Sequence, residues 1–230
     1  MSTLILSLET SSPVCSVALH RDGKLLGQSE LRLEKSHSTH LSVLVEQLLA
    51  NTQHGLADLA AVAVSDGPGS YTGLRIGAAA AKGLCFALNI PLLAISTLQA
   101  LAYQVAQVTA EADRYRYCPM LDARRMEVYS GLYSHTGEEL LAPAPLILDS
   151  ETLSEQLTHH RLLFFGNGAG KFQLLVAGQP NAGFLKGIEP SASAVGALAQ
   201  GAFERQEFHD VAYYEPFYLK EVHTTTPKAR

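Results

Sequence analysis

The chain has 230 residues, of which 47% are hydrophobic and 17% charged, so it can bury a sizeable core as one large domain or two small ones. This composition excludes disorder along the whole chain. The formal net charge of -5 argues against a protein that binds nucleic acid through its overall electrostatic field. If RNA is involved, we expect another subunit to supply the basic surface.

Cysteine usage and hydropathy indicate the compartment. The chain has three cysteines, Cys15, Cys85 and Cys118. They lie far apart without a Cys-x-x-Cys pair, which is typical of buried thiols in a reduced, cytosolic protein. The short apolar run from Leu4 to Leu8 has no basic segment before it, so it does not resemble a signal peptide. Lys82 interrupts the only stretch that approaches membrane length. We therefore expect a soluble, cytoplasmic protein that does not enter a membrane.

The first half of the chain alternates strand and helix patterns. It predicts strands at 4–8, at 14–19 and from residue 25, a helix at 38–51, a strand at 61–64 and a helix at 72–88. Asp22-Gly23 between two apolar runs is a strong hairpin signal. The glycine-rich turn 66–70 precedes the second helix, where Ser70 or Thr72 could act as the N-cap.

The second half repeats this order of elements. It predicts strands at 119–121 and 128–133, a glycine turn at 134–137, an extended run, a helix at 150–159, a strand at 162–165 and a further helix after the turn 166–170. Polar clusters that follow the first strand of each half, at Glu9 and Asp122, occupy equivalent places. The pattern predicts an internally duplicated α/β fold of the actin, hexokinase and Hsp70 superfamily, and any other mixed α/β domain is the alternative.

The duplication suggests two lobes, residues 1–104 and 105–210, with residues 211–230 returning to the first lobe. In such a fold the strand-end turns of both lobes face one cleft, where phosphates can bind. The residues expected to line it are Glu9, Thr10, Ser11, Ser12, Gly67, Gly69, Ser70, Asp122, Gly166 and Gly168. Glu9 could hold magnesium through water or could cap its own turn. The glycine turn is not a Walker motif, because no Gly-Lys-Ser/Thr follows it.

Three segments carry a closer resemblance. They are 8–12 with 16–19, the long glycine-rich segment 67–77, and 121–125 with 127–129; the segment 216–220 follows in the same order. Together they resemble the TsaB family, also called YeaZ, over about the whole chain. Tyr71 stands where Phe is usual, and Met126 stands where a small residue is common.

The resemblance implies a role in forming threonylcarbamoyladenosine next to the anticodon of tRNAs that read codons beginning with adenine. It implies a TsaD-like partner that transfers the threonylcarbamoyl group, a TsaE-like ATPase that acts on the pair, and contact with tRNA through the complex. We expect no cofactor of the chain's own, with ATP or ADP at the complex interface. In this family two helices of the first lobe form a bundle with those of TsaD or of a second TsaB copy.

The sequence offers a candidate surface for that bundle. Small residues recur every fourth position along the helix 72–88, and the helix 38–51 carries an apolar stripe. The expected interface residues are Leu41, Leu44, Val45, Leu48, Gly73, Leu74, Gly77, Ala80 and Ala81. The alternative is that the small-residue face packs inside its own lobe.

Three classes of function remain to be compared. A transferase like TsaD uses a His-x-x-x-His metal site, but Thr97 and Leu101 stand at those positions, and leucine binds no metal. A metallopeptidase needs a motif such as His-Glu-x-x-His, which is absent, and His37 with His40 is better explained as a solvated helix start. We therefore expect a binding subunit without catalytic residues or a metal site of its own. A nucleotide-dependent transferase or ATPase that acts alone is the alternative.

Overall fold

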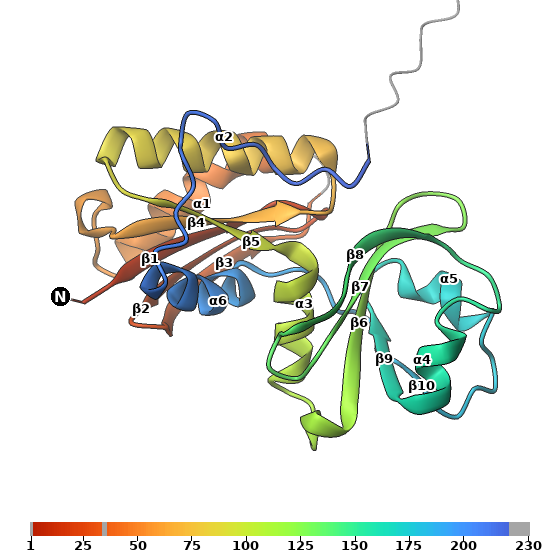
Figure 1. Ribbon diagram of the computed structural model, residues 1–230. Coiled ribbons are helices and arrows are strands. Elements are labelled where there is room, and N and C mark those ends of the chain that lie inside the picture. Colours follow the sequence, from red (N-terminus) through yellow and green to blue (C-terminus); the bar gives the residue numbers. More distant parts are fainter. Residues whose placement is uncertain (1, 34–35, 221–230) are drawn as a thin grey trace, which may run out of the picture.

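The computed structural model describes residues 2–33 and 36–220, which form two lobes (Figure 1). The expected tail at 221–230 lies outside the described residues. The first lobe contains β1 Leu4–Glu9, β2 Cys15–Arg21, β3 Lys24–Leu31, α1 His37–Asn51, the 3-10 turn Leu56–Asp58, β4 Ala61–Gly67, α2 Tyr71–Leu88, β5 Leu92–Ser96 and α6 Ala192–Glu204. The second contains β6 Tyr115–Asp122, β7 Glu127–Tyr133, β8 Glu139–Ile147, α4 Ser154–His159, β9 Arg161–Phe165, α5 Ala169–Gln173 and β10 Ala182–Phe184. Between them lie α3 Thr97–Ala106 and the 3-10 turn Ala112–Arg114.

The two lobes share one sheet topology. The strand order is β3-β2-β1-β4-β5 in the first sheet and β8-β7-β6-β9-β10 in the second. In each sheet the first three strands in chain order pair antiparallel, and the next two add in parallel. The predicted duplication of strand order and direction is therefore confirmed.

The predicted hairpin connects β2 to β3. Asp22 and Gly23 have φ angles of 50° and 75°, which is the left-handed pair that a two-residue type I′ turn requires. The Asp22 carboxylate also accepts a hydrogen bond from the Thr3 amide at 2.7 Å. The turn thus fixes the register of β2 and ties it to the start of β1.

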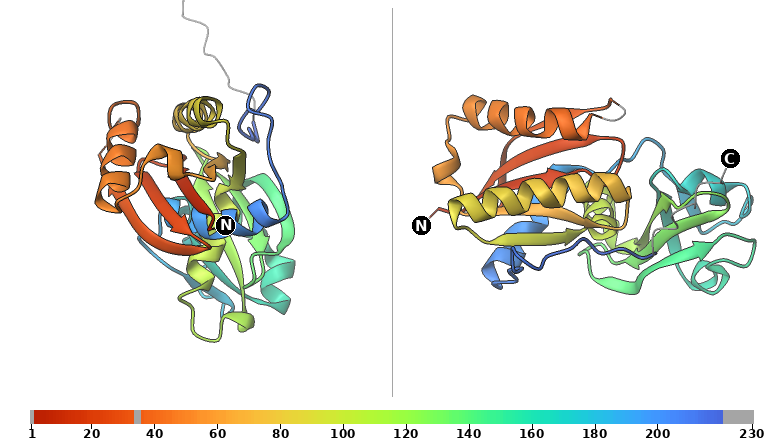
Figure 2. Two further views of the ribbon diagram at one scale, coloured as in Figure 1. Left: turned by 90° about the vertical axis from the view of Figure 1, so that its left-hand side faces the viewer. Right: turned by 90° about the horizontal axis from the view of Figure 1, so that it is seen from above.

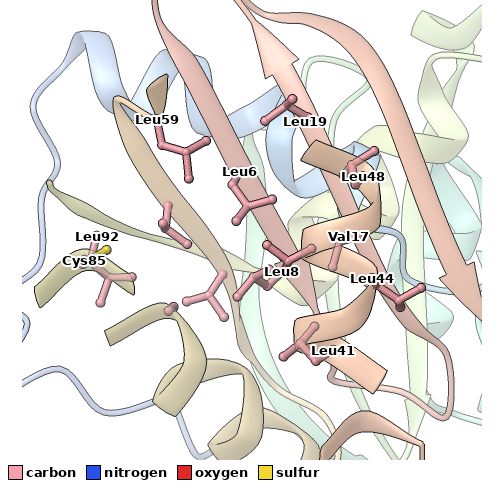
Figure 3. Packing of buried hydrophobic residues seen from close by; sticks show 14 of the residues in the cluster. Leu6, Leu8, Val17, Leu19, Leu41, Leu44, Leu48, Leu59, Cys85 and Leu92 are labelled. Carbon is pink, nitrogen blue, oxygen red and sulfur yellow. The ribbon is translucent and has the colours of Figure 1, made fainter. Parts of the chain in front are cut away.

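Helices cover both faces of the first sheet (Figures 1 and 2). On one face α1 and α2 run side by side, and the apolar side chains of α1 pack on β1 and β2, as Figure 3 shows for Leu41, Leu44 and Leu48 against Leu8 and Val17. These leucines are buried within their own lobe because they fill the space between helix and sheet. Leu44 and Leu48, which were expected at a partner interface, belong to this core, whereas Leu41 of the same stripe also lines the groove between α1 and α2.

The face of α2 that carries Gly73, Gly77 and Ala81 is also buried, together with Leu74. A methyl group at Gly73 would overlap the Thr10 carbonyl, and one at Gly77 would overlap the Thr10 hydroxyl. Thr10 Oγ1 donates a hydrogen bond to the Gly73 carbonyl at 2.9 Å. The ribbon of small residues therefore serves packing inside the lobe, and the prediction that it receives a partner is wrong.

The opposite face of the first sheet is covered by α6. Val195 and Ala199 of this helix pack with Ile5 of β1 and Ala63 of β4. This contact corrects the predicted second lobe of 105–210, because the chain returns to the first lobe by Ala192 rather than after residue 210. The apolar face of α6 is complementary to the first sheet, and sequence spacing alone does not reveal which sheet it covers.

The helix α3 contacts both lobes. Its Ala100 packs with the core beneath α6, whereas Leu98 and Leu101 pack with Tyr117 and Phe165 of the second lobe. The other face of the second sheet is covered by α4 and α5, around Phe164 and Phe172. Within residues 2–33 and 36–220, no helix combines the length and apolar character needed to cross a membrane.

His20 is the polar centre of the interface between β2 and α6. Its side chain is 2% exposed, and a side chain at Gly196 of α6 would overlap its ring. Burial lowers the pKa of His20, and a hydrogen bond with the Ser193 backbone acts in the opposite direction. The folded state therefore favours the neutral imidazole.

We predict that the protein loses stability as the pH falls below about 6.5, the value for a free histidine. In this range the imidazole of His20 binds a proton more readily in the unfolded chain than in the folded chain. The free energy of unfolding therefore falls by up to about 1.4 kcal/mol for each pH unit. Urea denaturation at stepwise pH from 7.5 to 5.5 measures the slope. The variant His20→Gln should have a shallower slope, and equal slopes in both proteins would show that His20 is not responsible.

The two glycines Gly77 and Gly83 of α2 give a matched test of its packing. A methyl group built at Gly83 would have no atom within 4 Å apart from its chain neighbours and the nearby backbone of α2 itself. Gly77→Ala should lower the free energy of unfolding by about 1–3 kcal/mol through overpacking against Thr10. Gly83→Ala should raise it by up to about 1 kcal/mol through helix propensity. Denaturant titrations of both variants check this, and a shift of the same sign in both would contradict the described packing.

Candidate functional site

An open, mainly apolar groove lies between α1 and α2. Its volume is about 800 Å³, and Leu8 of β1 contributes to its lining. Its apolar wall residues are Leu41, Val45, Leu49 and Ala50 of α1, Leu56 after it, and Ile76, Ala79, Ala80, Gly83 and Leu84 of α2. Its concave shape and mainly apolar lining make it a candidate protein-binding site.

The groove contains only part of the predicted interface. Leu41, Val45 and Ala80 line it as expected, whereas the remaining predicted residues lie in the core described above. A second small-residue stripe of α2, which includes Ala79 and Gly83, lines the groove and was not among the predicted interface residues. Because both stripes have helical spacing, the sequence could have suggested this alternative, but it could not decide which stripe faces inward.

The rim of the groove carries few charges. Its polar lining residues are His37, Ser38, Ser42, Glu46 and His54. The His54 ring also contacts the Arg21 guanidinium. Farther along α2, the Phe86 side chain is 84% exposed, next to the end of the groove-lining stripe. The chemistry of this surface suits an apolar helix or helix pair of another protein, held by packing rather than by ion pairs.

The strand-end turn of the first lobe is covered by the chain itself. Thr10, Ser11 and Ser12 are all buried. The Ser70 amide donates a hydrogen bond to the Ser11 carbonyl at 2.7 Å, and a methyl group at Gly69 would overlap Ser11. In this conformation the turn does not offer its amides and hydroxyls to a phosphate. Ser70 caps α2 by accepting a hydrogen bond from the Gly73 amide, as the turn alternative in the sequence analysis expects.

Glu9 lies at the end of β1 and is fully buried. Its Oε1 accepts a hydrogen bond from the Ser11 amide at 2.6 Å, and its Oε2 has no hydrogen-bond partner among the described residues. Burial raises the pKa of Glu9, and hydrogen bonds involving Ser11 and Ser65 act in the opposite direction. Of the two roles considered for Glu9, this geometry supports the structural one, in which the carboxylate holds its own turn.

The corresponding turn of the second lobe is more open. The Asp122 carboxylate forms an ion pair with Lys171 at 2.7 Å and accepts a hydrogen bond from the Arg124 amide at 2.6 Å. Partial burial acts to raise its pKa, but these two contacts together lower the pKa of Asp122. Gly166 and Gly168 pack on the Met120 backbone, and the Gly168 amide donates to the Met120 carbonyl at 2.9 Å.

The predicted cleft residues thus divide between two environments. Those of the first lobe, from Glu9 to Ser12, are sealed by the turn before α2, whereas Asp122 is exposed at the edge of the second lobe. Gly67 lies against the backbone of Phe217. The described residues include no group of three or more His, Cys, Asp or Glu side chains that could hold a metal ion. Thr97 and Leu101, at the expected metal positions, are both buried in α3.

Comparison with known proteins identifies relatives of this chain. The model of the TsaD family, tRNA N6-adenosine threonylcarbamoyltransferase, matches residues 31–184. The tRNA threonylcarbamoyladenosine biosynthesis protein TsaB of Bacillus subtilis is 37% identical over 131 residues, which are 57% of this chain and 55% of that protein. TsaB of Escherichia coli is 34% identical over 129 residues, 56% of this chain and 54% of that protein. The chain thus spans about half the length of the curated relatives it matches.

Solved structures extend the similarity to almost the whole chain. At low identity, the activator of the 2-hydroxyisocaproyl-CoA dehydratase from Clostridium difficile, with bound ADPNP, has a TM-score of 0.51 at 11% identity, covering 89% of this chain and 96% of that one. At this identity the similarity concerns the fold alone. YeaZ from Pseudomonas aeruginosa is 32% identical with a TM-score of 0.81, covering 94% of this chain and 100% of that chain. The chain therefore belongs to the TsaB family, also called YeaZ.

Proposed function

We propose that this chain is a non-catalytic subunit of the machinery that forms threonylcarbamoyladenosine in tRNA. The observation that carries the proposal is the uncovered apolar groove between α1 and α2 in a chain of the TsaB family. The target is the adenosine next to the anticodon in tRNAs that read codons beginning with adenine. The names of the TsaB relatives, which are tRNA threonylcarbamoyladenosine biosynthesis proteins, support the pathway.

The proposed partner is a TsaD-like protein that docks in the groove. The match of this chain to the TsaD family model supports a partner of related fold, which would carry equivalent helices. A TsaE-like ATPase acts on the pair, with ATP or ADP at the complex interface, and tRNA is reached through the complex. A second copy of this chain competes for the same groove as a homodimer.

The buried turn after β1 favours this function over a transferase or ATPase that acts alone. Thr10 to Ser12 would have to part from the glycine face of α2 before they could receive a phosphate. Leu101 offers no ligand where TsaD-like proteins are expected to place a metal-binding histidine. Catalysis in the complex is therefore assigned to the partner.

A charge placed in the groove should block docking. In the variant Ala80→Glu, a carboxylate would be desolvated against an apolar partner surface, which should weaken binding by roughly 2–3 kcal/mol, about 30- to 150-fold in Kd. Isothermal titration calorimetry with a purified TsaD-like protein measures the change. Ala177→Glu introduces the same charge at an exposed position of the second lobe and should bind like the wild type.

Two outcomes would count against the proposal. Equal affinities for Ala80→Glu and the wild type would place the interface elsewhere. Threonylcarbamoyl transfer to tRNA by the highly purified chain alone would show that it is an enzyme. The expected result is no transfer by the chain alone and transfer when the TsaD-like and TsaE-like proteins and ATP are added with the threonylcarbamoyl donor.

A further inference from the structure

After α6 the chain forms a strap, residues 208–220, that runs along the first lobe and ends at the second (Figure 1). The strap carries the late segment 216–220 noted in the sequence. Tyr214 and Phe217, in the segment expected to return to the first lobe, contact that lobe, whereas Lys220 contacts the second. It crosses from one lobe to the other at a place separate from α3, which also joins the lobes.

The inner part of the strap is anchored in the first lobe. The His209 amide donates a hydrogen bond to the Leu92 carbonyl at 2.9 Å, which forms a short antiparallel bridge with β5. Tyr214 is 7% exposed and packs in the core. Lys82 of α2 donates from Nζ to the carbonyls of Ala212 and Tyr214 at 3.1 and 3.0 Å. This part is an integral piece of the lobe.

The middle of the strap covers the turn between β4 and α2. The Tyr214 hydroxyl donates to Asp66 Oδ1 at 2.9 Å, and the Phe217 amide donates to the Asp66 carbonyl at 2.8 Å. The Phe217 carbonyl would lie 2.7 Å from a methyl group at Gly67, whose φ of +112° already requires glycine. The strap backbone therefore rests directly on the turn.

The outer end of the strap is held by side chains at the surface. The rings of Tyr218 and Tyr71 lie 5.1 Å apart, at the first turn of α2. Lys220 Nζ forms an ion pair with Glu127 Oε2 at 2.6 Å. Glu127 is the first residue of β7, so this contact crosses to the second lobe. The Lys220 side chain is 42% exposed, which leaves the pair open to screening by salt.

We propose that residues 215–220 form a reversible latch between the lobes, closed by the Lys220–Glu127 ion pair, while residues 208–214 stay fixed. The contrast between a buried anchor and an exposed end supports this division, because exposed contacts open at lower free energy than core contacts. Opening releases the Asp66 carbonyl from the Phe217 amide and uncovers Gly67 and the first turn of α2, while the Tyr214 hydroxyl stays on the Asp66 carboxylate. Since α2 also lines the groove, the latch links the groove helix to the second lobe.

Charge reversal tests the latch in the isolated chain. In Lys220→Glu, the attraction to Glu127 becomes repulsion, and hydrogen exchange of the Phe217 amide should accelerate by about fivefold or more. Raising the salt concentration of the wild type should act in the same direction. The double variant Lys220→Glu/Glu127→Lys should return the exchange rate toward that of the wild type. Arg205→Glu, which breaks the more exposed ion pair with Glu207 outside the strap, is the charge-reversal control and should leave the exchange rate unchanged.

A distance measurement tests the effect on the lobes. Spin labels at the exposed positions Asn51→Cys in α1 and Leu174→Cys in the second lobe report their separation. The three native thiols are buried, and burial raises the pKa of Cys118 to about 12, so they react slowly with the label. Pulsed electron paramagnetic resonance should give a narrow distribution for the wild type and a broader one for Lys220→Glu.

Two results would overturn the proposal. If hydrogen exchange at Phe217 and the distance distribution are both the same in Lys220→Glu as in the wild type, the ion pair does not keep the latch closed. Failure of the double variant to restore either quantity would show that Lys220 acts through another group. Neither result bears on partner docking, because both measurements use the chain alone.

Discussion

The packing of the glycine face of α2 on the turn after β1 is the contact on which the rest of the molecule depends. Gly73 and Gly77 let the helix approach until the Thr10 hydroxyl bonds to the helix backbone, and Gly69 lets the preceding turn close over Ser11. Such a close approach gains dispersion energy along the length of the helix that faces the turn, and it leaves no space for side chains at the glycine positions. It has two consequences, one at the strand-end turn and one at the opposite face of the helix.

The first consequence is that a turn which could face a phosphate becomes part of the core. The Thr10 hydroxyl, the Ser11 amide and the Ser12 hydroxyl form hydrogen bonds within the lobe, and Glu9 is buried with them. A buried carboxylate oxygen without a hydrogen-bond partner among the described residues costs roughly 1–3 kcal/mol. Burial raises the pKa of Glu9 because the neutral form escapes part of this cost. The hydrogen bond that the Ser11 amide donates to Glu9 Oε1 offsets a further part of this cost.

Much of the fold follows from local patterns, whereas the role of α2 does not. The Asp22-Gly23 turn and the repeated order of elements depend on short-range chemistry, and the sequence predicts them. On α2, two stripes of small residues with the same helical spacing compete. The contact with Thr10, far away in the sequence, decides that Gly77 faces inward and Ala79 outward. The sequence likewise does not show which sheet α6 covers. Its apolar face packs on the first sheet because Gly196 leaves space for the His20 ring.

The second consequence concerns the other faces of α2, since the helix has a different environment on each of three sides. Its glycine face is core, the side that carries Ile76, Ala80 and Gly83 forms one wall of the groove, and Lys82 on a further side holds the strap. Because a helix is rigid over its length, a displacement at one of these faces is transmitted to the others without any flexible element. A protein docked in the groove would press on the same helix whose first turn carries Tyr71 against Tyr218. The buried glycine contact resists that displacement, so the contact between Tyr71 and Tyr218 at the outer end of the strap is the one that can yield first.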